Sequence, residues 1–401
     1  MKVLYTTPFL EYPAAGGPQL RIENSIKALS KICDLHIAHQ ADFFEDRVKV
    51  TDSYFKRFAN SYVTFYRYPK NRMLRIAYKL LNKFLGYGLD STANKIISHI
   101  KKNKFEIVWF GYGNISYSLI SRVKQALPKV KVVCDTDSVW SRFVLRELPY
   151  AEGRRKAKIA RNGALKEAEE YSWVRLCEVT TAVSEVDAEY YRAIAAEPGR
   201  VKIFSNVIDI QSYAVDPVRP LNFKKPCIFL AGSFGPDSAM NMAANWVLEE
   251  VLPIVRRHYP DVHFYIVGRD SDSEFSHRAN EHVSVTGKVE SVLPYLCHAD
   301  VALVPLKFES GTRFKILEAG ACHVPLVSTA LGAEGIPVVH NRDILIADDP
   351  KDFAAAVLRL LDDPELARGL AESCYQLIAE NYSVEVQKQE ASAILDYLDN
   401  G

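Results

Sequence analysis

Residues 301–320 read VALVPLKFESGTRFKILEAG, and this stretch decides the fold class. Val301–Pro305 is a short apolar run rich in β-branched residues, which predicts a strand buried on both faces. Polar residues follow, and Thr312 suits the capping position of a helix that continues to Gly320. A strand, a loop and a helix in this order are typical of α/β proteins with a parallel sheet.

The same succession recurs along the chain, with one interruption. Residues 216–226 contain three prolines among polar residues, which predicts a linker. We therefore expect two α/β domains in tandem, residues 1–215 and 216–380, and an amphipathic helical tail at residues 381–401. Strands are expected at residues 3–7, 35–38, 107–110, 130–134, 180–183 and 201–204 before the linker, and at 227–231, 263–267, 283–285, 301–305, 325–328 and 344–347 after it.

Length and composition agree with a globular protein of two domains. The chain has 401 residues, of which 48% are hydrophobic and 25% charged, so a disordered, collagenous or coiled-coil protein is excluded. No run of about 18 apolar residues predicts a membrane span, and we expect no signal peptide. The seven cysteines lack C-x-x-C spacing, so we expect free thiols in a reducing cytoplasm and no metal site.

The two halves of the chain differ in charge. Residues 1–210 contain 34 Lys and Arg against 22 Asp and Glu, a net charge of +12. Residues 211–401 contain 16 against 27, a net charge of −11. The first half is therefore expected to attract an anion, such as a phospholipid surface, a lipid-linked phosphate, an acidic glycan or nucleic acid.

In open parallel sheets, ligands bind at the carboxyl ends of the strands, so the loops after strands are candidate sites. Gly16 and Gly17 follow the first strand and precede a helix, whose N-terminus offers amide groups to an anion. An ordinary strand-to-helix turn explains these two glycines equally well. In the second domain, backbone donors are expected at three strand exits, namely Gly232 with Ser233, Gly268 with Arg269, and Lys288 with Val289.

The loop and helix after residue 305 form the strongest candidate site. Arg313 and Lys315 fall in the first helical turn, where cations oppose the helix dipole unless an anion is bound. Glu318 lies further along the helix, where a carboxylate is able to accept hydrogen bonds from sugar hydroxyls. The alternative is a surface helix with an ion pair between Lys315 and Glu318.

The C-terminal half resembles the retaining glycosyltransferases of the GT-B fold, in particular the large family four, glycosyl transferases group 1. This resemblance implies two Rossmann-like α/β domains facing across a cleft, and a C-terminal helix that crosses back onto the first domain. It also implies a nucleotide-sugar donor in the second domain, an acceptor in the first, retention of configuration and no obligatory metal. The stretches that carry it are Phe229–Ser233, Phe264–Gly268, Val283–Val289, Ser310–Ala319, Val324–Thr329 and Leu331–Gly335, with looser matches at Gly16–Gly17, Ala182–Ser184 and Phe204–Asp209.

The chain departs from the family pattern at three places. The pattern is Glu, seven residues, then Glu; here the second is Glu318, the first is replaced by Ser310, and Glu309 stands one residue early. The Arg and Lys that often follow the second domain's first strand are missing, so Arg313 and Lys315 are expected to bind the diphosphate. Asp135 stands near the position of a frequent His, where it either orients or deprotonates the acceptor hydroxyl or caps the backbone.

The predicted donor site therefore comprises the three strand exits, the two glycines of the first loop, and the polar residues of the main loop and helix. We expect Arg313, Lys315, Asp135 and Glu309 to take part in catalysis. The remaining donor-binding residues are Gly16, Gly17, Gly232, Ser233, Gly268, Arg269, Lys288, Val289, Ser310, Gly311, Thr312 and Glu318.

Residues 71–88, NRMLRIAYKLLNKFLGYG, combine four basic residues with apolar ones. Such a basic amphipathic helix is a candidate for an anionic membrane surface, and the alternative is a helix that packs in the core with a solvated basic face.

The sequence thus predicts a cytoplasmic glycosyltransferase that uses a UDP-sugar or GDP-sugar in cell-surface polysaccharide assembly. The alternatives of a freely dissolved protein and of one bound peripherally to the inner face of a membrane stay open. Its acceptor is expected to be a glycan or a lipid-linked molecule. Two alternatives are a nucleotide-sugar epimerase of the same fold and a non-enzymatic protein that binds an anion or a nucleic acid. No nucleic-acid motif is visible, so a nucleic-acid partner is not expected.

Overall fold

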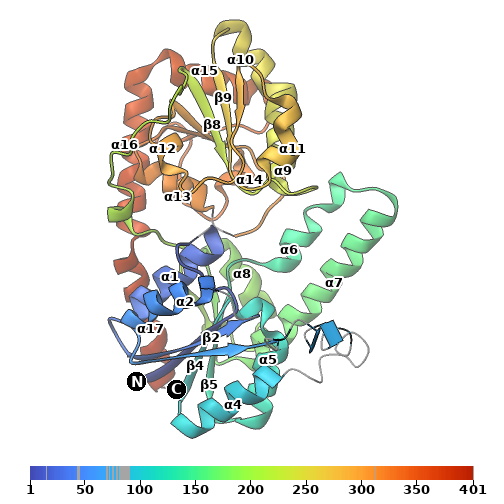
Figure 1. Cartoon of the computed structure of the whole chain (residues 1–401), viewed down its shortest axis with the longest axis vertical. Coiled ribbons are helices and arrows are strands. Elements are labelled where there is room, and N and C mark those ends of the chain that lie inside the picture. Colours follow the sequence, from blue (N-terminus) through green and yellow to red (C-terminus); the bar gives the residue numbers. More distant parts are fainter. Residues whose placement is uncertain are drawn as a thin grey trace. The chain divides into compact units, whose positions relative to one another are not determined.

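Two parallel β-sheets organise the chain, each in a separate unit (Figure 1). The computed structural model describes residues 1–14, 16–42, 46–68, 71, 73–74, 76–77, 80, 91–311 and 313–400. Unit 1 comprises residues 1–141, 157–207 and 384–401, and unit 2 comprises residues 142–156 and 208–383.

Unit 1 contains a seven-stranded sheet in the order β3-β2-β1-β4-β5-β6-β7, with every neighbouring pair parallel. The central strands are short apolar runs, and their burial on both faces explains the lack of a polar alternation. The strands are β1 (Lys2–Thr7), β2 (Asp34–Ala41), β3 (Ser61–Tyr66), β4 (Ile107–Gly111), β5 (Lys131–Asp135), β6 (Val179–Ala182) and β7 (Val201–Ile203).

The tail helix completes unit 1 by packing against its first helix. Ile22 and Ile26 of the first helix share a buried cluster with Ile394 and Leu398 of the tail. The periodicity of the tail sequence, with apolar residues on one face, explains this packing. The helices of unit 1 are α1 (Gly17–Leu29), α2 (Asp46–Phe55), η1 (Lys56–Phe58), α4 (Ser91–Asn103), η3 (Gly113–Ile115), α5 (Tyr117–Ala126), α8 (Glu185–Ile194), η5 (Pro198–Arg200) and α17 (Val384–Asn400).

Two helices are divided between the units. They are α6 (Trp140–Leu145) and α7 (Gly153–Leu176), and the short helix η4 (Leu148–Tyr150) lies between them. The end of α6, all of η4 and the start of α7 belong to unit 2, although they lie in the N-terminal half of the sequence.

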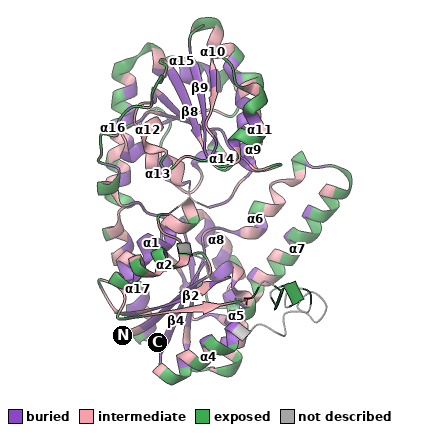
Figure 2. Ribbon diagram, viewed as in Figure 1, coloured by how far each residue is buried: buried purple, intermediate pink, exposed green. Residues whose placement is uncertain are grey.

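Unit 2 contains a six-stranded parallel sheet in the order β10-β9-β8-β11-β12-β13. Its buried core surrounds the sheet, as Figure 2 shows. The strands are β8 (Cys227–Ala231), β9 (His263–Val267), β10 (Val283–Val285), β11 (Val301–Val304), β12 (Leu326–Ser328) and β13 (Leu345–Ile346). The helices are η6 (Ile210–Ser212), α9 (Ala239–Trp246), the π-helix η7 (Val247–Val251), α10 (Leu252–His258), α11 (Ser271–Phe275), η8 (Ser276–Arg278), α12 (Leu293–Leu296), α13 (Phe314–Ala321), α14 (Ala330–Ala333), α15 (Pro350–Asp362) and α16 (Pro364–Asn381).

The strands expected from the sequence are all present, and among the described residues one further strand was not predicted. This strand, β3, lies at the edge of its sheet and has one neighbour, so its residues are half-buried rather than apolar throughout. Helices α9 and α10 form one continuous run from Ala239 to His258 through the π-helix at Val247–Val251. Pro253 follows this wide turn, and because proline lacks the amide hydrogen, it is unable to continue regular helical bonding.

Three glycines bring the ends of β8, β9 and β10 together. Gly268 has φ +131°, and a Cβ atom there would lie 2.1 Å from the carbonyl oxygen of Gly232. Gly287 has φ +68°, and its carbonyl accepts a hydrogen bond of 3.1 Å from the amide of Gly268. Any side chain at position 268 would therefore separate two strand exits.

We predict that Gly268→Ala lowers the free energy of unfolding of unit 2 by at least about 3 kcal/mol, because it adds both a clash and a strained φ. Gly369→Ala is the matched control, since nothing lies within 4 Å of a Cβ there. At this exposed position in α16, alanine should raise the free energy of unfolding by about 0.5–1 kcal/mol. Urea unfolding of both variants measures the difference, and equal stability would contradict the close approach.

Candidate functional site

The glycine amides at the strand exits of unit 2 are used within the protein. The amide of Gly232 donates to the carbonyl of Val267 at 3.0 Å, and the amide of Gly268 donates to that of Gly287. The amide of Gly287 donates to Ser271 Oγ at 2.9 Å. The expectation that Gly232 and Gly268 offer backbone donors to a ligand is therefore wrong, and these glycines instead allow the exits to pack closely.

Two cations stand at the same exits with their side chains in solvent. Arg269 lies two residues after the end of β9 and Lys288 lies three residues after the end of β10, and both are exposed. Within the part of the chain that the structure describes, neither side chain has a hydrogen-bond or ion-pair partner. Ser233 is also exposed, and Val289 is half-buried. This edge of an otherwise acidic half therefore carries unpaired positive charge.

The loop after β11 leads into α13, and the side chain of its N-cap residue, Arg313, makes no capping hydrogen bond among the described residues. Ser310 is 9% exposed, and Gly311 has φ +81°, which favours glycine. Arg313 occupies the N-cap position and α13 begins at Phe314. The prediction that Thr312 caps this helix concerns a residue outside the described ones.

Arg313 points into the protein rather than toward solvent. It is 5% exposed, and its guanidinium donates to the carbonyl of Gly311 and, at 3.5 Å, to that of Leu331. This guanidinium therefore ties the loop before α13 to the α14 helix. The expected contact between Arg313 and a diphosphate stays a prediction.

Lys315 and Glu318 line one cavity of about 20 Å³, which is sufficient for a single water molecule. Both side chains are half-buried, and no ion pair joins them, so the alternative of a surface helix with a Lys315–Glu318 ion pair is wrong. Tyr213 donates a hydrogen bond of 3.0 Å from its hydroxyl to Glu318 Oε1. The other lining residues are Phe229, Ala231, Val292, Leu296, Ala302, Leu303 and Val304.

Burial shifts the pKa values of both groups toward their neutral forms. It lowers the pKa of Lys315 below its ordinary value, although the carboxylates of Glu309 and Glu318 oppose the shift. It raises the pKa of Glu318, against the hydrogen bond from Tyr213 and the charge of Lys315. A ligand that brings negative charge to Lys315 and hydroxyl groups to Glu318 would therefore stabilise the charged forms of both side chains.

A segment from the N-terminal half of the sequence braces this loop in unit 2. Arg146 makes two hydrogen bonds to the carboxylate of Glu334, at 2.6 and 2.8 Å. It also donates to the carbonyl of Glu309 at 2.7 Å. Tyr150 donates to the carbonyl of Lys307 at 3.3 Å. Sequence reasoning missed this brace, because no motif links residues 142–156 to a loop more than 150 positions later.

In unit 1, the Gly16–Gly17 loop leads into α1 as expected. Gly16 has extended backbone at the N-cap, Gly17 is the first helical residue, and no side chain caps the helix. A Cβ at Gly16 would meet only the side chain of Gln19, at 3.7 Å. A side chain at Gly16 would therefore meet no clash among the described residues.

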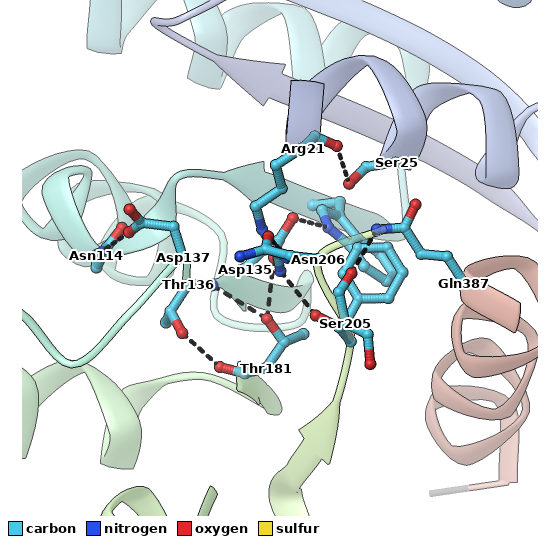
Figure 3. Close-up of polar contacts among 12 residues, drawn as sticks. Arg21, Ser25, Asn114, Asp135, Thr136, Asp137, Thr181, Ser205, Asn206 and Gln387 are labelled. Carbon is cyan, nitrogen blue, oxygen red and sulfur yellow. Dashed lines mark hydrogen bonds and ion pairs between the residues drawn. The ribbon is translucent and has the colours of Figure 1, made fainter. Parts of the chain in front are cut away.

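Asp135 is the centre of a buried network in unit 1 (Figure 3). It is 1% exposed, and its Oδ1 is paired with Arg21, which is equally buried. Thr181 donates to Oδ1 at 3.0 Å and Trp109 donates to Oδ2 at 3.2 Å. Because both oxygens are occupied and shielded, Asp135 is placed as a structural residue and not as a group that meets an acceptor.

Arg21 extends this network to the end of β7 and thus toward the tail helix. It donates to Asn206 Oδ1 at 2.7 Å and to the carbonyl of Phe204 at 3.0 Å. The neighbouring Ser205 donates to the Glu390 carboxylate from both its amide and its hydroxyl, at 2.7 Å each. Gln387 donates to the Ser205 carbonyl at 2.9 Å. Helix α1, the loop after β7 and α17 are therefore held by one set of polar contacts.

Asp137, two residues beyond Asp135, is the less buried of the two carboxylates. It is half-buried, and its Oδ1 accepts hydrogen bonds from Asn114 at 2.6 Å and from Trp140 at 3.0 Å. Burial raises the pKa of Asp137, although these donors oppose the shift. The sequence did not single out Asp137, because two aspartates close together after a strand give no indication of which one is less buried.

Most of the basic amphipathic segment at residues 71–88 lies outside the described residues. Among those described, Met73 is 81% exposed, Leu74 60%, Ile76 53% and Leu80 52%. These four side chains do not pack in a core. Within the described parts of the chain, no helix is long and apolar enough to cross a bilayer, and no group of three His, Cys, Asp or Glu side chains is placed to hold a metal ion.

The two Rossmann-like units and the comparisons with solved structures confirm the predicted GT-B fold class. The chain is similar over its whole length to a sucrose-phosphate synthase from Thermosynechococcus elongatus, with 16% identity, coverage of 100% of both chains and a TM-score of 0.72. It is also similar to Anabaena HepE in complex with UDP, with 13% identity, coverage of 99% and 100%, and a TM-score of 0.67.

The family resemblance is confirmed for the region that carries it. Residues 225–363 match the family Glycosyl transferases group 1. The chain is 23% identical over 165 residues to an uncharacterized 44.6 kDa protein in the cps region of Klebsiella pneumoniae. This match covers 39% of the present chain and 42% of the Klebsiella protein, so it spans less than half of either.

We predict that Arg21→Met lowers the free energy of unfolding of unit 1 by about 3–5 kcal/mol, because it leaves the Asp135 carboxylate buried without its partner. The double variant Arg21→Met with Asp135→Leu should recover much of this loss, since it removes both charges. Urea unfolding measures both. A loss under about 1 kcal/mol for Arg21→Met would show that Asp135 does not depend on this pair.

Proposed function

We propose that this protein is a retaining glycosyltransferase, with the nucleotide-sugar donor bound at the carboxyl edge of the sheet in unit 2. The observation that carries the proposal is the placement of Lys315 and Glu318 on one cavity wall at the start of α13. The family match at residues 225–363 includes both residues and supports the same assignment.

The donor diphosphate is assigned to Lys315, with Arg269 and Lys288 as further cations. A departing nucleoside diphosphate gains negative charge in the transition state, and fixed cations in a partly dry site stabilise that charge strongly. A bound diphosphate also favours the charged form of Lys315, which burial otherwise disfavours. Arg313 contributes by holding the loop, through the carbonyls of Gly311 and Leu331.

The hydroxyl groups of the donor are assigned to Glu318, whose second oxygen is left for a ligand when Tyr213 bonds to Oε1. Ser310 occupies the position of the missing family glutamate, and its Oγ is buried without a partner among the described residues. Ser310 and the nearby Glu309 are therefore assigned to the transferred sugar.

In the proposed reaction, an acceptor hydroxyl oxygen bonds to the anomeric carbon as the bond from that carbon to the phosphate oxygen breaks. The new bond forms on the same face, and the hydroxyl proton passes to the departing phosphate oxygen. No dedicated base and no metal are needed in this scheme. If a carboxylate orients the acceptor, Asp137 is the better candidate, because it is less buried than Asp135.

The acceptor is assigned to unit 1, and its chemistry is inferred from charge. The net charge of +12 over residues 1–210 suits an anionic glycan or a lipid-linked phosphate. The exposed apolar residues at 73, 74, 76 and 80, beside four basic positions of the sequence, support contact of residues 71–88 with an anionic membrane surface. A role in cell-surface polysaccharide assembly on the cytoplasmic side of a membrane fits these features.

We predict that one nucleoside diphosphate among UDP, GDP, ADP and dTDP stabilises the protein against heat, and that the shift survives EDTA. Ligand at about 100 times its dissociation constant adds roughly 2.7 kcal/mol, which a thermal-shift assay resolves. Glu318→Ala should abolish this shift and sugar transfer while the unliganded melting temperature changes little. UDP or GDP is the expected ligand.

No shift with any nucleotide would contradict a donor site in unit 2. A shift that depends on a divalent ion would contradict the metal-independent scheme. Analysis of the sugar after incubation without acceptor separates transfer from epimerisation, because an epimerase alters the sugar alone.

We predict that affinity for the matching nucleotide-sugar falls as the pH is raised through the lowered pKa of Lys315. The ligand binds more tightly to the charged form of Lys315, so binding raises the pKa of this lysine. At a pH between the pKa of the free protein and that of the complex, Lys315 takes up a proton on binding. Affinity is therefore highest at a pH below both pKa values. Calorimetric titrations from pH 7 to 10 measure this dependence. Lys315→Met should bind weakly with a flat pH profile, and a sloped profile in that variant would assign the titration to another group.

A further inference from the structure

A second cavity in unit 2 lies at the edge of the sheet where β9 and β10 begin. Its volume is about 380 Å³, within the range of small-molecule sites. The strand exits of the donor site are at the opposite ends of the same parallel strands, so this cavity is separate from that site. Its lining consists of Leu248, Leu252, Pro253, Arg256, Arg257, Arg278, Asn280 and Val283.

Three arginines from two elements converge on this cavity. Arg256 and Arg257 lie in the last turn of α10, and Arg278 ends η8. Cations are favoured at a helix C-terminus by the helix dipole, which accounts for the first two but not for Arg278. Three guanidinium groups on one cavity are notable because residues 211–401 have a net charge of −11.

The guanidinium groups are only partly neutralised. Arg278 pairs with Glu249 at 2.6 Å, and this pair is solvent-exposed. Arg256 donates from Nε to the carbonyl of Pro260 at 3.4 Å, and its terminal nitrogens have no partner among the described residues. Arg257 is exposed and has no polar partner in the same described part of the chain. The cavity thus has two positive charges in excess.

Apart from Asn280, the remaining wall is apolar and includes residues on both sides of the junction between the π-helix and α10. Leu248 lies in the π-helix, and Leu252 and Pro253 follow it at the start of α10. Val283 contributes the first residue of the edge strand β10. A ligand here would therefore meet charge on one side and hydrocarbon on the other.

We propose that this cavity is a second binding site, for a small molecule that carries a phosphate group. Guanidinium groups bind phosphate through paired, charge-assisted hydrogen bonds, and the apolar wall accommodates an organic body. The shared chemistry is the phosphate dianion, whose source is either free phosphate or a phosphate monoester. The proposal does not depend on the function assigned to the other edge of the sheet.

Calorimetric titration with inorganic phosphate and with phenyl phosphate tests the site in the full chain. Arg256→Gln with Arg257→Gln, and separately Arg278→Gln, should each weaken binding at least about tenfold. Arg368→Gln is the matched control, because Arg368 is an exposed arginine of the same unit that contacts the nearby Glu365 carboxylate and Pro364 carbonyl. Lys315→Ala is the second control, since it removes the proposed diphosphate contact, and binding should survive in both controls.

The probes also distinguish the source of the phosphate. Tighter binding of phenyl phosphate assigns the site to a monoester, and equal affinities assign it to free phosphate. Asn280→Asp keeps the size of the side chain and places a negative charge on the cavity wall, so it should abolish phosphate binding. This variant serves as the test if the arginine variants fail to fold. Binding that is unchanged in the arginine and Asn280 variants, or is lost in Arg368→Gln or Lys315→Ala, would overturn the proposal.

Discussion

All the strands of each sheet run in the same direction, and this constraint positions everything else in the molecule. Because the strands are parallel, the loops that follow them all begin at the carboxyl edge of the sheet. Residues far apart in sequence therefore lie close together at that edge. In unit 2 the exits of β8, β9 and β10 approach closely only because Gly268 has no side chain to meet the carbonyl of Gly232. The loop after β11 adds the polar residues of α13 to the same edge.

Buried charge is treated in opposite ways in the two units. In unit 1, Arg21 and Asp135 neutralise each other and are further satisfied by Asn206, Thr181 and Trp109. Such a pair is costly to break and offers nothing to a ligand. In unit 2, Lys315 and Glu318 share a cavity without an ion pair, and burial moves the pKa of each toward neutrality. A substrate that contacts Lys315 and Glu318 would therefore stabilise their charged forms.

The sequence predicted the fold well because its signals are local. Short apolar runs bounded by glycine and proline indicated the buried strands, whereas the half-exposed edge strand Ser61–Tyr66 gave no such run. The tail helix was expected from its periodicity and packs on α1. The π-helix before Pro253 has no signal in the sequence, because a proline early in a helix also fits an ordinary first turn.

The site was predictable only in part, because burial and pairing depend on distant residues. The block at Ser310–Glu318 indicated which loop matters, but not that Arg313 turns inward to the carbonyl of Leu331. Nothing near Asp135 in the sequence shows that Arg21 lies against it. The brace from Arg146 to Glu334 joins positions 188 residues apart, and no local pattern indicates it.

A crystal structure of the protein with the nucleoside diphosphate that binds it most tightly tests the central claim most directly. The account predicts the diphosphate within hydrogen-bonding distance of Lys315 Nζ, and ligand hydroxyl groups against Glu318. Nucleotide bound away from the carboxyl edge of the unit 2 sheet, with Lys315 and Glu318 untouched, would contradict it.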